Sequence, residues 1–309
     1  TPAITSTTLE DFEAHMAYLE ESDLVVVPLS EIVENPEIPN DRRVAITFDD
    51  AYANIFELAV PRLIKRGFPF TIFVATEYVD RPGFFSWDEL RYIEAHGGTV
   101  ANHSHSHLHM LRKQEDESHR AWIKRIRLDI EKAQRLLEAN LRQPAKYLAY
   151  PYGEYDLHIL ALIKEMGFVG FGQQSGAAGA TSLKTIMPRF PLSGPYAELE
   201  TFKTKVNTLA LPIEVPVISP IFDTNPPTLS LKFPNPEGLR LSDLACYGPS
   251  GKTHLTSISD RELQAQNPNP LPVGRSRYNC TMPGPDGRFY WFSQLWIQKR
   301  PDGSWYPEP

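Results

Sequence analysis

Apolar residues recur at helical spacing at the start of the chain. Leu9, Phe12 and Met16 mark one face of a helix. They follow Thr7 and Thr8, and threonine often caps a helix N-terminus. Short runs rich in β-branched residues then alternate with further helical patterns up to about residue 210. This alternation predicts an α/β fold with βα units around a parallel sheet or barrel.

The same patterns locate the individual elements of this region. Ser86 and Glu89 form a capping-box pattern that opens one helix. Gly67 and Gly167 follow two other helical patterns, and glycine favours helix termination at such positions. We expect helices at about 9–19, 54–65, 86–95, 116–139, 156–166 and 199–209, and strands at 24–27, 44–48, 70–75, 99–102, 147–150 and 168–171.

The composition of the chain changes after Leu211. Sixteen of the 28 prolines lie beyond this residue, and no helical period continues there. The runs at 228–233 and 289–297 predict strands instead. Because 309 residues exceed the usual size of a single hydrophobic core, we predict two domains. They are an α/β domain at residues 1–211 and an all-β domain at residues 212–309.

The only two cysteines, Cys246 and Cys280, belong to the second predicted domain. They indicate either one disulfide formed in an oxidising compartment or two buried thiols. Tyr278 precedes the second cysteine by two residues, as in the tyrosine corner of immunoglobulin-like sandwiches. We therefore expect a small immunoglobulin-like β-sandwich with an accessory role.

Charge and hydropathy argue against several classes of partner. The formal net charge is -7 and no block of lysine or arginine is sustained, so nucleic acid and anionic membrane surfaces are not expected as main partners. No segment approaches the roughly 18 uninterrupted apolar residues of a membrane span. The chain begins at Thr1 without Met or an apolar leader. We expect that any signal peptide has been removed or was never included.

Four clusters of unusual residues follow the ends of expected strands. Active sites of parallel βα folds lie at this edge, because the loops there converge on one mouth. The clusters are Thr47-Phe48-Asp49-Asp50, Asn102-His103-Ser104-His105-Ser106-His107, Tyr150-Pro151-Tyr152-Gly153 and Pro188-Arg189-Phe190. Their common position predicts one shared site.

Carboxylates and imidazoles in these clusters indicate a metal site. Asp49 and Asp50 are adjacent, so one can bind an ion while the other faces a substrate. The alternative is that one caps the following helix and the other is solvated. His103 and His107 are spaced so that two imidazoles can converge on one ion, and with one carboxylate they suit zinc or a similar divalent metal. The alternatives for the histidines are a polar surface loop or a fortuitous metal site of little function.

These residues carry a resemblance to a known family. Thr-Phe-Asp-Asp, His-Ser-x-Ser-His and Pro-Tyr-Gly, in this order, resemble the first three motifs of the NodB-type polysaccharide deacetylases, carbohydrate esterase family 4. The resemblance covers about residues 1–210, and the form Tyr-Pro-Tyr-Gly-Glu-Tyr is most similar to the branch of the poly-N-acetylglucosamine deacetylases. It implies a distorted βα barrel of NodB type that uses a divalent ion, usually zinc, to remove acetyl groups from N-acetylated sugars. Cobalt and nickel are alternative ions.

The resemblance also implies roles for individual residues. Asp49 corresponds to the general base, and Asp50, His103 and His107 correspond to the metal ligands. The backbone N–H of Tyr152 corresponds to the donor that stabilises the developing oxyanion, an interaction of a kind that contributes about 3 kcal/mol. Pro151, Tyr152 and Gly153 are accordingly expected to contact substrate, and their alternative reading is a simple tight turn. His105 and His109 are expected to be bystanders or to support the ligands.

Two family residues are missing from this chain. The family has an arginine shortly before Pro-Tyr-Gly that pairs with the base, but Leu148, Ala149 and Tyr150 occupy that stretch. We expect Arg189 to replace it and to keep Asp49 ionised; the alternative is an ordinary surface arginine. The late histidine that serves as general acid is also absent. In the poly-N-acetylglucosamine branch it lies before Thr-Phe-Asp-Asp, a region that can precede Thr1. His15 and His158 are expected to be ordinary residues.

Aromatic residues are further candidates for substrate binding, because the apolar faces of sugar rings stack on aromatic rings. Trp87, Tyr152 and Phe190 are placed for this role, although Trp87 equally suits an anchor for its helix. The tryptophans of the second domain favour a sandwich core over a sugar site. They are Trp291, Trp296 and Trp305.

The sequence thus predicts a metal-dependent de-N-acetylase that acts on a polymer or oligomer containing N-acetylglucosamine, in the periplasm or after secretion. Two alternatives stay open. One is an esterase that removes O-acetyl groups from xylan or peptidoglycan, because the same chemistry attacks esters. The other is a carbohydrate-binding scaffold that retains the metal but has lost turnover.

Overall fold

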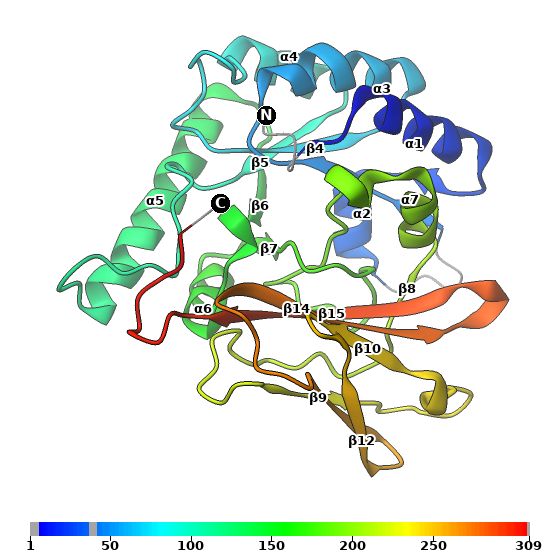
Figure 1. Cartoon of the computed structure of the whole chain (residues 1–309). Coiled ribbons are helices and arrows are strands. Elements are labelled where there is room, and N and C mark those ends of the chain that lie inside the picture. Colours follow the sequence, from blue (N-terminus) through cyan, green and yellow to red (C-terminus); the bar gives the residue numbers. More distant parts are fainter. Residues whose placement is uncertain (1–5, 37–41, 308–309) are drawn as a thin grey trace.

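The computed structural model describes residues 6–36 and 42–307 of the chain. In Figure 1 the helical first part of the chain lies above a second part made mostly of strands. We call the elements α1 to α7 with their sheet the α/β part, and the elements from β8 onward the β-rich part. The α-helices are α1 (Leu9–Glu21), α2 (Leu29–Glu34), α3 (Val60–Arg66), α4 (Trp87–Ala95), α5 (His119–Asn140), α6 (Leu157–Glu165) and α7 (Leu199–Val206).

Five parallel strands form the main sheet of the α/β part, in the order β3-β4-β5-β6-β7. Each strand pairs with the next along the chain, as expected for successive βα units. Two further strands form a separate parallel pair, so the described strands make an open sheet rather than a closed barrel. The strands are β1 (Val25–Val26), β2 (Arg43–Val44), β3 (Ile46–Phe48), β4 (Phe70–Val74), β5 (Thr99–Asn102), β6 (Ala145–Ala149) and β7 (Val169–Phe171).

The predicted helix signals are present in the structure. Thr8 caps α1, and Ser86 and Glu89 form a complete capping box at the start of α4. Gly67 ends α3 with φ 65°, a left-handed conformation that glycine adopts without a steric penalty. The core face of α5 includes the buried residues Trp122 and Ile126. No helix in the described part of the chain is long and apolar enough to cross a membrane.

Several predictions of local structure were inaccurate, and the helix expected at 199–209 ends at Val206 because Leu209 and Ala210 form β8. The strand expected at 44–48 is two strands, because β2 pairs with β1 whereas β3 pairs with β4. The helix expected at 54–65 begins with a π-helical segment, Ile55–Ala59, before α3. Pro61 explains the irregularity, since proline has no N–H to donate to the preceding turn. The short helix α2 was not predicted.

The β-rich part contains two antiparallel groups of strands. Three strands are ordered β12-β13-β9, and five are ordered β11-β10-β14-β15-β8, with β8 joining in parallel. The strands are β8 (Leu209–Ala210), β9 (Thr228–Lys232), β10 (Ala245–Gly248), β11 (Gly251–Lys252), β12 (His254–Ser259), β13 (Glu262–Gln266), β14 (Gly274–Pro283) and β15 (Phe289–Gln298).

A disulfide joins Cys246 on β10 to Cys280 on β14, which decides between the two readings of the cysteines. Tyr278 is fully buried, and its hydroxyl donates to the carbonyl of Pro227 and accepts from the N–H of Asn267. These bonds tie β14 to two other segments. That the part is an immunoglobulin-like sandwich stays a prediction.

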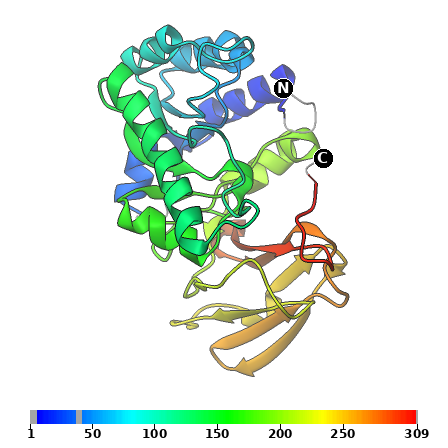
Figure 2. The same cartoon turned by 90° about the vertical axis from the view of Figure 1, so that its left-hand side faces the viewer.

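The two parts share packing and backbone pairing. Strand β8 follows α7 directly yet pairs with β15 near the end of the chain. Leu295, Ile297 and Tyr306 are buried in one apolar cluster with Ile126 and Ile159 of the α/β part. The segment after β15, red in Figures 1 and 2, leaves the strands and runs back along the α/β part. The predicted boundary near Leu211 therefore lies within a continuous packed structure.

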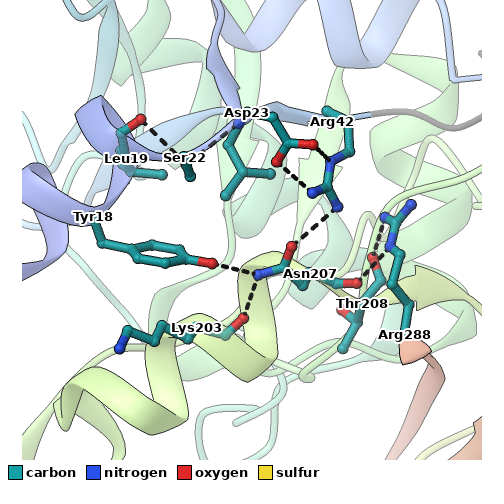
Figure 3. A network of polar contacts seen from close by, with 10 residues as sticks. Tyr18, Leu19, Ser22, Asp23, Arg42, Lys203, Asn207, Thr208 and Arg288 are labelled. Atoms are coloured by element: carbon teal, nitrogen blue, oxygen red, sulfur yellow. Dashed lines mark hydrogen bonds and ion pairs between the residues drawn. The ribbon is translucent and has the colours of Figure 1, made fainter. Parts of the chain in front are cut away.

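A polar network fixes a second contact between the parts (Figure 3). Arg288, in the turn between β14 and β15, donates to the carbonyl oxygens of Asn207 (2.8 Å) and Thr208 (3.4 Å) at the end of α7. The amide of Asn207 also accepts from Arg42 and donates to the hydroxyl of Tyr18. The β14–β15 turn is thus bonded to the residues that follow α7, and these are tied in turn to Tyr18 of α1.

Candidate active site

Three side chains from the segments after β3 and β5 converge at the carboxyl edge of the main sheet. Oδ1 of Asp50 lies 3.3 Å from Nε2 of His103 and 3.2 Å from Nε2 of His107. One potential ligand atom from each residue lies within 4.8 Å of the other two. Two imidazole nitrogens and one carboxylate oxygen form a donor set that suits zinc or a similar divalent ion, with coordination positions left for water and substrate.

Hydrogen bonds fix the His103 ring and the backbone of the loop after β5, which carries both histidines. Nδ1 of His103 bonds the carbonyl of Ala149 at 2.8 Å, which leaves Nε2 free to face Asp50. The side chain of Asn102 accepts from the N–H of Ser104, and the hydroxyl of Ser104 accepts from the N–H of His107. The bond at Nδ1 therefore orients the His103 imidazole, and the bonds of Asn102 and Ser104 shape the backbone that carries His107.

Left-handed backbone gathers at the site in residues other than glycine. The φ angles are 71° at Asp50, 58° at Ala51, 65° at Ser104, 51° at His107 and 59° at Tyr152. Such conformations are disfavoured for L-residues and persist only where the surrounding structure imposes them. Here they turn the chain so that side chains from separate loops face one point.

Arg189 forms a bidentate ion pair with Asp49, at 2.7 Å to Oδ1 and 2.8 Å to Oδ2. Its Nε also donates to the carbonyl of Gly172, and Nη1 donates to the hydroxyl of Thr47. The guanidinium lies over the ring of Phe73 at 5.3 Å. The predicted pairing of Arg189 with Asp49 is present, and the reading of Arg189 as an ordinary surface arginine is wrong.

The two neighbouring carboxyls differ in their surroundings. Burial tends to raise the pKa of Asp49, but the charges of Arg189 and His103 and the hydrogen bonds from Arg189 together outweigh it, and the pKa lies below its usual range. Burial also tends to raise the pKa of Asp50, yet the neighbouring imidazoles of His103 and His107 lower it well below its usual range. Both groups are carboxylates near neutral pH.

The Pro151–Gly153 turn follows β6 after one residue. It faces the loop that carries His103 and His107. The ring of Tyr152 lies 4.7 Å from that of His107 and stacks on that of His109 at 3.7 Å, with an interplanar angle of 8°. The turn is therefore in contact with the loop that carries two of the potential ligands.

The other residues singled out in the sequence have varied surroundings. Trp87 packs against the apolar core of the α/β part, as its reading as a helix anchor predicts. Phe190 contacts Trp291 of the β-rich part edge to face at 5.3 Å. Trp296 is buried among the apolar residues of the β-rich part, whereas Trp305 packs against the shared cluster.

The histidines considered as acids lie in other settings. His15 is buried in α1, where it bonds the carbonyl of Ala197 and stacks on Phe202. His158 lies on α6 against His119, 4.5 Å between ring centroids. Neither has a described contact with Asp49, Asp50 or the ligand histidines, so the expectation that both are ordinary residues agrees with their packing.

Sequence reasoning missed one group of residues beside the turn. Glu154 is fully buried and accepts from the hydroxyl of Tyr306 at 2.7 Å, bonds Nδ1 of His109 at 3.1 Å and pairs with Arg275 at 3.4 Å. Its position directly after Pro-Tyr-Gly marked it as close to the site. Nothing in the local sequence indicated the partners Arg275 and Tyr306, which lie in the β-rich part and after it.

Comparisons with known proteins agree with the motifs. Residues 37–171 match the family model of the polysaccharide deacetylases. The putative polysaccharide deacetylase YxkH of Bacillus subtilis is 26% identical over 175 residues, which cover 55% of this chain and 59% of that protein. A poly-beta-1,6-N-acetyl-D-glucosamine N-deacetylase of Staphylococcus aureus is 28% identical over 198 residues, which cover 61% of this chain and 68% of that protein.

The fold is also similar to that of a solved structure. IcaB from Ammonifex degensii superposes with a TM-score of 0.58 and 20% sequence identity, over 65% of this chain and 90% of that chain. At this identity the likeness concerns the fold. Together with the family match, it confirms the predicted resemblance to NodB-type deacetylases, with an open parallel sheet.

Proposed function

We propose that the chain removes N-acetyl groups from a polysaccharide containing N-acetylglucosamine, with the help of a divalent metal, because residues 37–171 match the family model of the polysaccharide deacetylases. Acetate and a free amine are the products. The observation that carries the proposal is the convergence of Asp50, His103 and His107 beside an Asp49 that is paired with Arg189. The names of the relatives support the class of substrate.

The metal in this proposal is Zn²⁺, with Co²⁺ or Ni²⁺ as alternatives. Asp50, His103 and His107 would hold it, since their donor atoms match its preferences in kind and number. When bound, the ion supplies Lewis-acid activation of the acetyl carbonyl and of water. The bond from His103 to the carbonyl of Ala149 holds this imidazole in the tautomer that a ligand requires.

Asp49 is the general base of the proposed reaction. Water attacks the carbonyl carbon of the acetamide and gives a proton to the Asp49 carboxylate. Arg189 keeps that carboxylate ionised and fixes both of its oxygens. The carbon–nitrogen bond then breaks, and the amine leaves with a proton from a donor that the described residues do not identify.

The Pro151-Tyr152-Gly153 turn is the proposed site of oxyanion stabilisation and substrate contact. The left-handed backbone of Tyr152, with φ 59°, bends the chain sharply at this residue. The N–H of Tyr152 would donate to the carbonyl oxygen as negative charge develops on it. A backbone donor held by a rigid turn needs no reorientation during the reaction.

The proposed location is the periplasm or the extracellular space, and the disulfide between Cys246 and Cys280 supports an oxidising compartment. We also keep the division into an α/β domain at 1–211 and a β-sandwich domain at 212–309 as a proposal. Because apolar packing and strand pairing cross that boundary, we propose that the second domain also supports the structure of the first.

Acetate release by the full chain tests the proposed function. The protein is stripped with a chelator and assayed on β-1,6- and β-1,4-linked N-acetylglucosamine oligomers before and after zinc is added. We expect zinc to restore acetate release, and Asp49→Asn to lower kcat by about 10² to 10⁴ as expected for loss of a general base. Asp88→Asn is the matched control, because Asp88 lies at the exposed start of α4.

Other outcomes of this assay favour the competing functions. Release from acetylxylan but not from the amide oligomers would indicate the esterase. Tight zinc binding without release from either class would indicate a binding scaffold and would contradict the proposal.

A further inference from the structure

Glu154 is a buried carboxylate at the junction of the two parts of the molecule. It follows the Pro151-Tyr152-Gly153 turn directly, and its side chain has no exposed surface. A buried carboxylate is costly unless hydrogen bonds and charges compensate it. Burial tends to raise its pKa, but hydrogen bonds from His109 and Tyr306 and the charges of His109 and Arg275 lower it below its usual value.

Two of the compensating groups come from the far end of the chain. Arg275 lies on β14, and its Nη1 is 3.4 Å from Oε1 of Glu154. The hydroxyl of Tyr306, in the segment after β15, donates to the same oxygen at 2.7 Å. The buried carboxylate thus depends on residues outside the span that matches the deacetylase family.

Arg275 also contacts Tyr152 itself. Its Nη1 donates to the carbonyl oxygen of Tyr152 at 3.2 Å. Its guanidinium lies 5.7 Å from the centre of the Tyr152 ring and 5.9 Å from that of Tyr306. His109, which bonds Glu154, stacks on the Tyr152 ring. Tyr152 is therefore held at its backbone and at its ring by groups that also meet Glu154.

We propose that Arg275 and Tyr306 are positioning residues that hold the Tyr152 turn in its working conformation through Glu154, so that the β-rich part completes the active site. The inference rests on the proposed function, because the role of the Tyr152 N–H belongs to that proposal. The left-handed backbone of Tyr152 gives the physical reason. A strained turn persists only while the surrounding structure imposes its conformation. The contacts of Arg275 and Tyr306 are part of that surrounding structure.

Steady-state kinetics of the zinc-loaded full chain test this proposal. Arg275→Met keeps the aliphatic stem but removes the donors to Tyr152 and Glu154, and Tyr306→Phe removes one hydroxyl. We expect Arg275→Met to lower kcat about ten- to hundredfold, since a misplaced donor loses this much transition-state stabilisation. KM should change by less than about threefold, and Arg275→Lys should restore part of kcat. A smaller fall in kcat is expected for Tyr306→Phe.

Arg288→Met is the matched control. Arg288 is also an arginine of the β-rich part that donates to backbone carbonyls of the α/β part, but its partners are Asn207 and Thr208. If the β-rich part merely stabilises the fold, both methionine variants should affect stability and neither should change kcat selectively. A kcat of Arg275→Met within about twofold of the wild type would overturn the proposal.

Amide hydrogen exchange separates this inference from the proposed function. In Arg275→Met the segment 150–156 should lose protection while segments at 46–50 and 100–107 keep it, and Arg288→Met should leave all three unchanged. If the wild type releases no acetate, the proposed function fails, yet selective loss of protection in Arg275→Met still supports the positioning role. Unchanged exchange of segment 150–156 would overturn that role whether or not the protein is active.

Discussion

At the scale of single residues, Arg189 controls the charge and orientation of Asp49. Its two nitrogens bind both carboxylate oxygens, and further bonds to Gly172 and Thr47 fix the guanidinium. Lysine carries the same charge but cannot form the planar bidentate pair. The geometry of this pair, and not charge alone, is therefore expected to matter for turnover.

The first prediction concerns this pair. Arg189→Lys should lower kcat about tenfold, and Arg189→Gln about a hundredfold, because a mispositioned or protonated Asp49 is a poor base. Zinc content should stay at the wild-type level in both, since Arg189 has no described contact with Asp50, His103 or His107. The measurement is kcat with metal analysis of the same samples. Equal activity of all three proteins would show that Asp49 does not need its partner.

Lys205 allows a second prediction at this scale, on stability rather than activity. It is 6% exposed, and its ammonium donates to the carbonyl oxygens of Pro191 and Tyr196. Burial lowers its pKa from the ordinary 10.5 to about 8. Between these values the unfolded chain binds a proton that the folded chain has released, so this group raises the free energy of unfolding as pH increases.

Lys205→Met should lack this contribution. Urea unfolding at pH 7.5 and pH 10 should show that the free energy of unfolding of the wild type, relative to the variant, rises by up to about 3 kcal/mol over this interval. Subtracting the free energy of unfolding of the variant from that of the wild type cancels the pH dependence of the titratable groups that both proteins share. A constant or falling difference would mean that Lys205 stays protonated in the fold.

How far single residues could be predicted depended on how local their partners are. Asp50, His103 and His107 follow expected strands of one parallel sheet, so their meeting could be inferred from the common edge at which such strands end. Arg189 could be inferred because Asp49 needed a cation and this arginine followed an apolar run. The pairing of Glu154 with Arg275 spans 121 residues, and no pattern in the sequence specifies such a contact.

At the scale of secondary-structure elements, capping sets where α4 begins. The hydroxyl of Ser86 accepts from the N–H of Glu89 at 3.2 Å, and the Glu89 carboxylate accepts from the N–H of Ser86 at 2.7 Å. Ser86→Ala should therefore lower the free energy of unfolding by about 1 kcal/mol. Thermal or urea unfolding measures the effect, and Ser257→Ala, in an exposed strand, is the control. Equal stability of the two variants would contradict the capping argument.

Elements with strong local signals were predicted well, and those that depend on tertiary pairing were not. The capping box and the glycine after α3 act within a few residues, so the sequence reveals them directly. The division of 43–48 into β2 and β3 depends on which neighbouring strand each half pairs with. The π-helical start before α3 could have been anticipated from Pro61, which removes one donor from the helix.

At the scale of the whole molecule, the sequence indicated two regions of different composition. It did not indicate how closely these regions pack against each other. The change in proline content after Leu211 lies next to β8, the first strand of the β-rich part. The spacing of apolar residues does not indicate that β8 pairs with β15. Nor does it indicate that the last residues pack against the α/β part. Both contacts join positions that are far apart along the chain, and such long-range contacts leave no signal in the local sequence.

The last prediction follows from this shared packing. A chain that ends at residue 211 loses Leu295, Ile297 and Tyr306 from the cluster around Ile126 and Ile159. Each buried apolar side chain contributes about 1.5–3 kcal/mol, so the melting temperature of the truncated chain should fall by about 10 °C or more. Calorimetry of the full chain should in turn show a single cooperative transition.

The same experiment contains its own control. Leu231→Ala in the full chain creates a cavity only in the core of the β-rich part, where Leu231 is fully buried. If the two parts unfold together, this substitution should lower the one transition without splitting it. Two separate transitions, or a truncated chain that melts at the temperature of the full chain, would show that the α/β part is stable alone. Arg275 and Tyr306 would then act on the Tyr152 turn without supporting the fold around it.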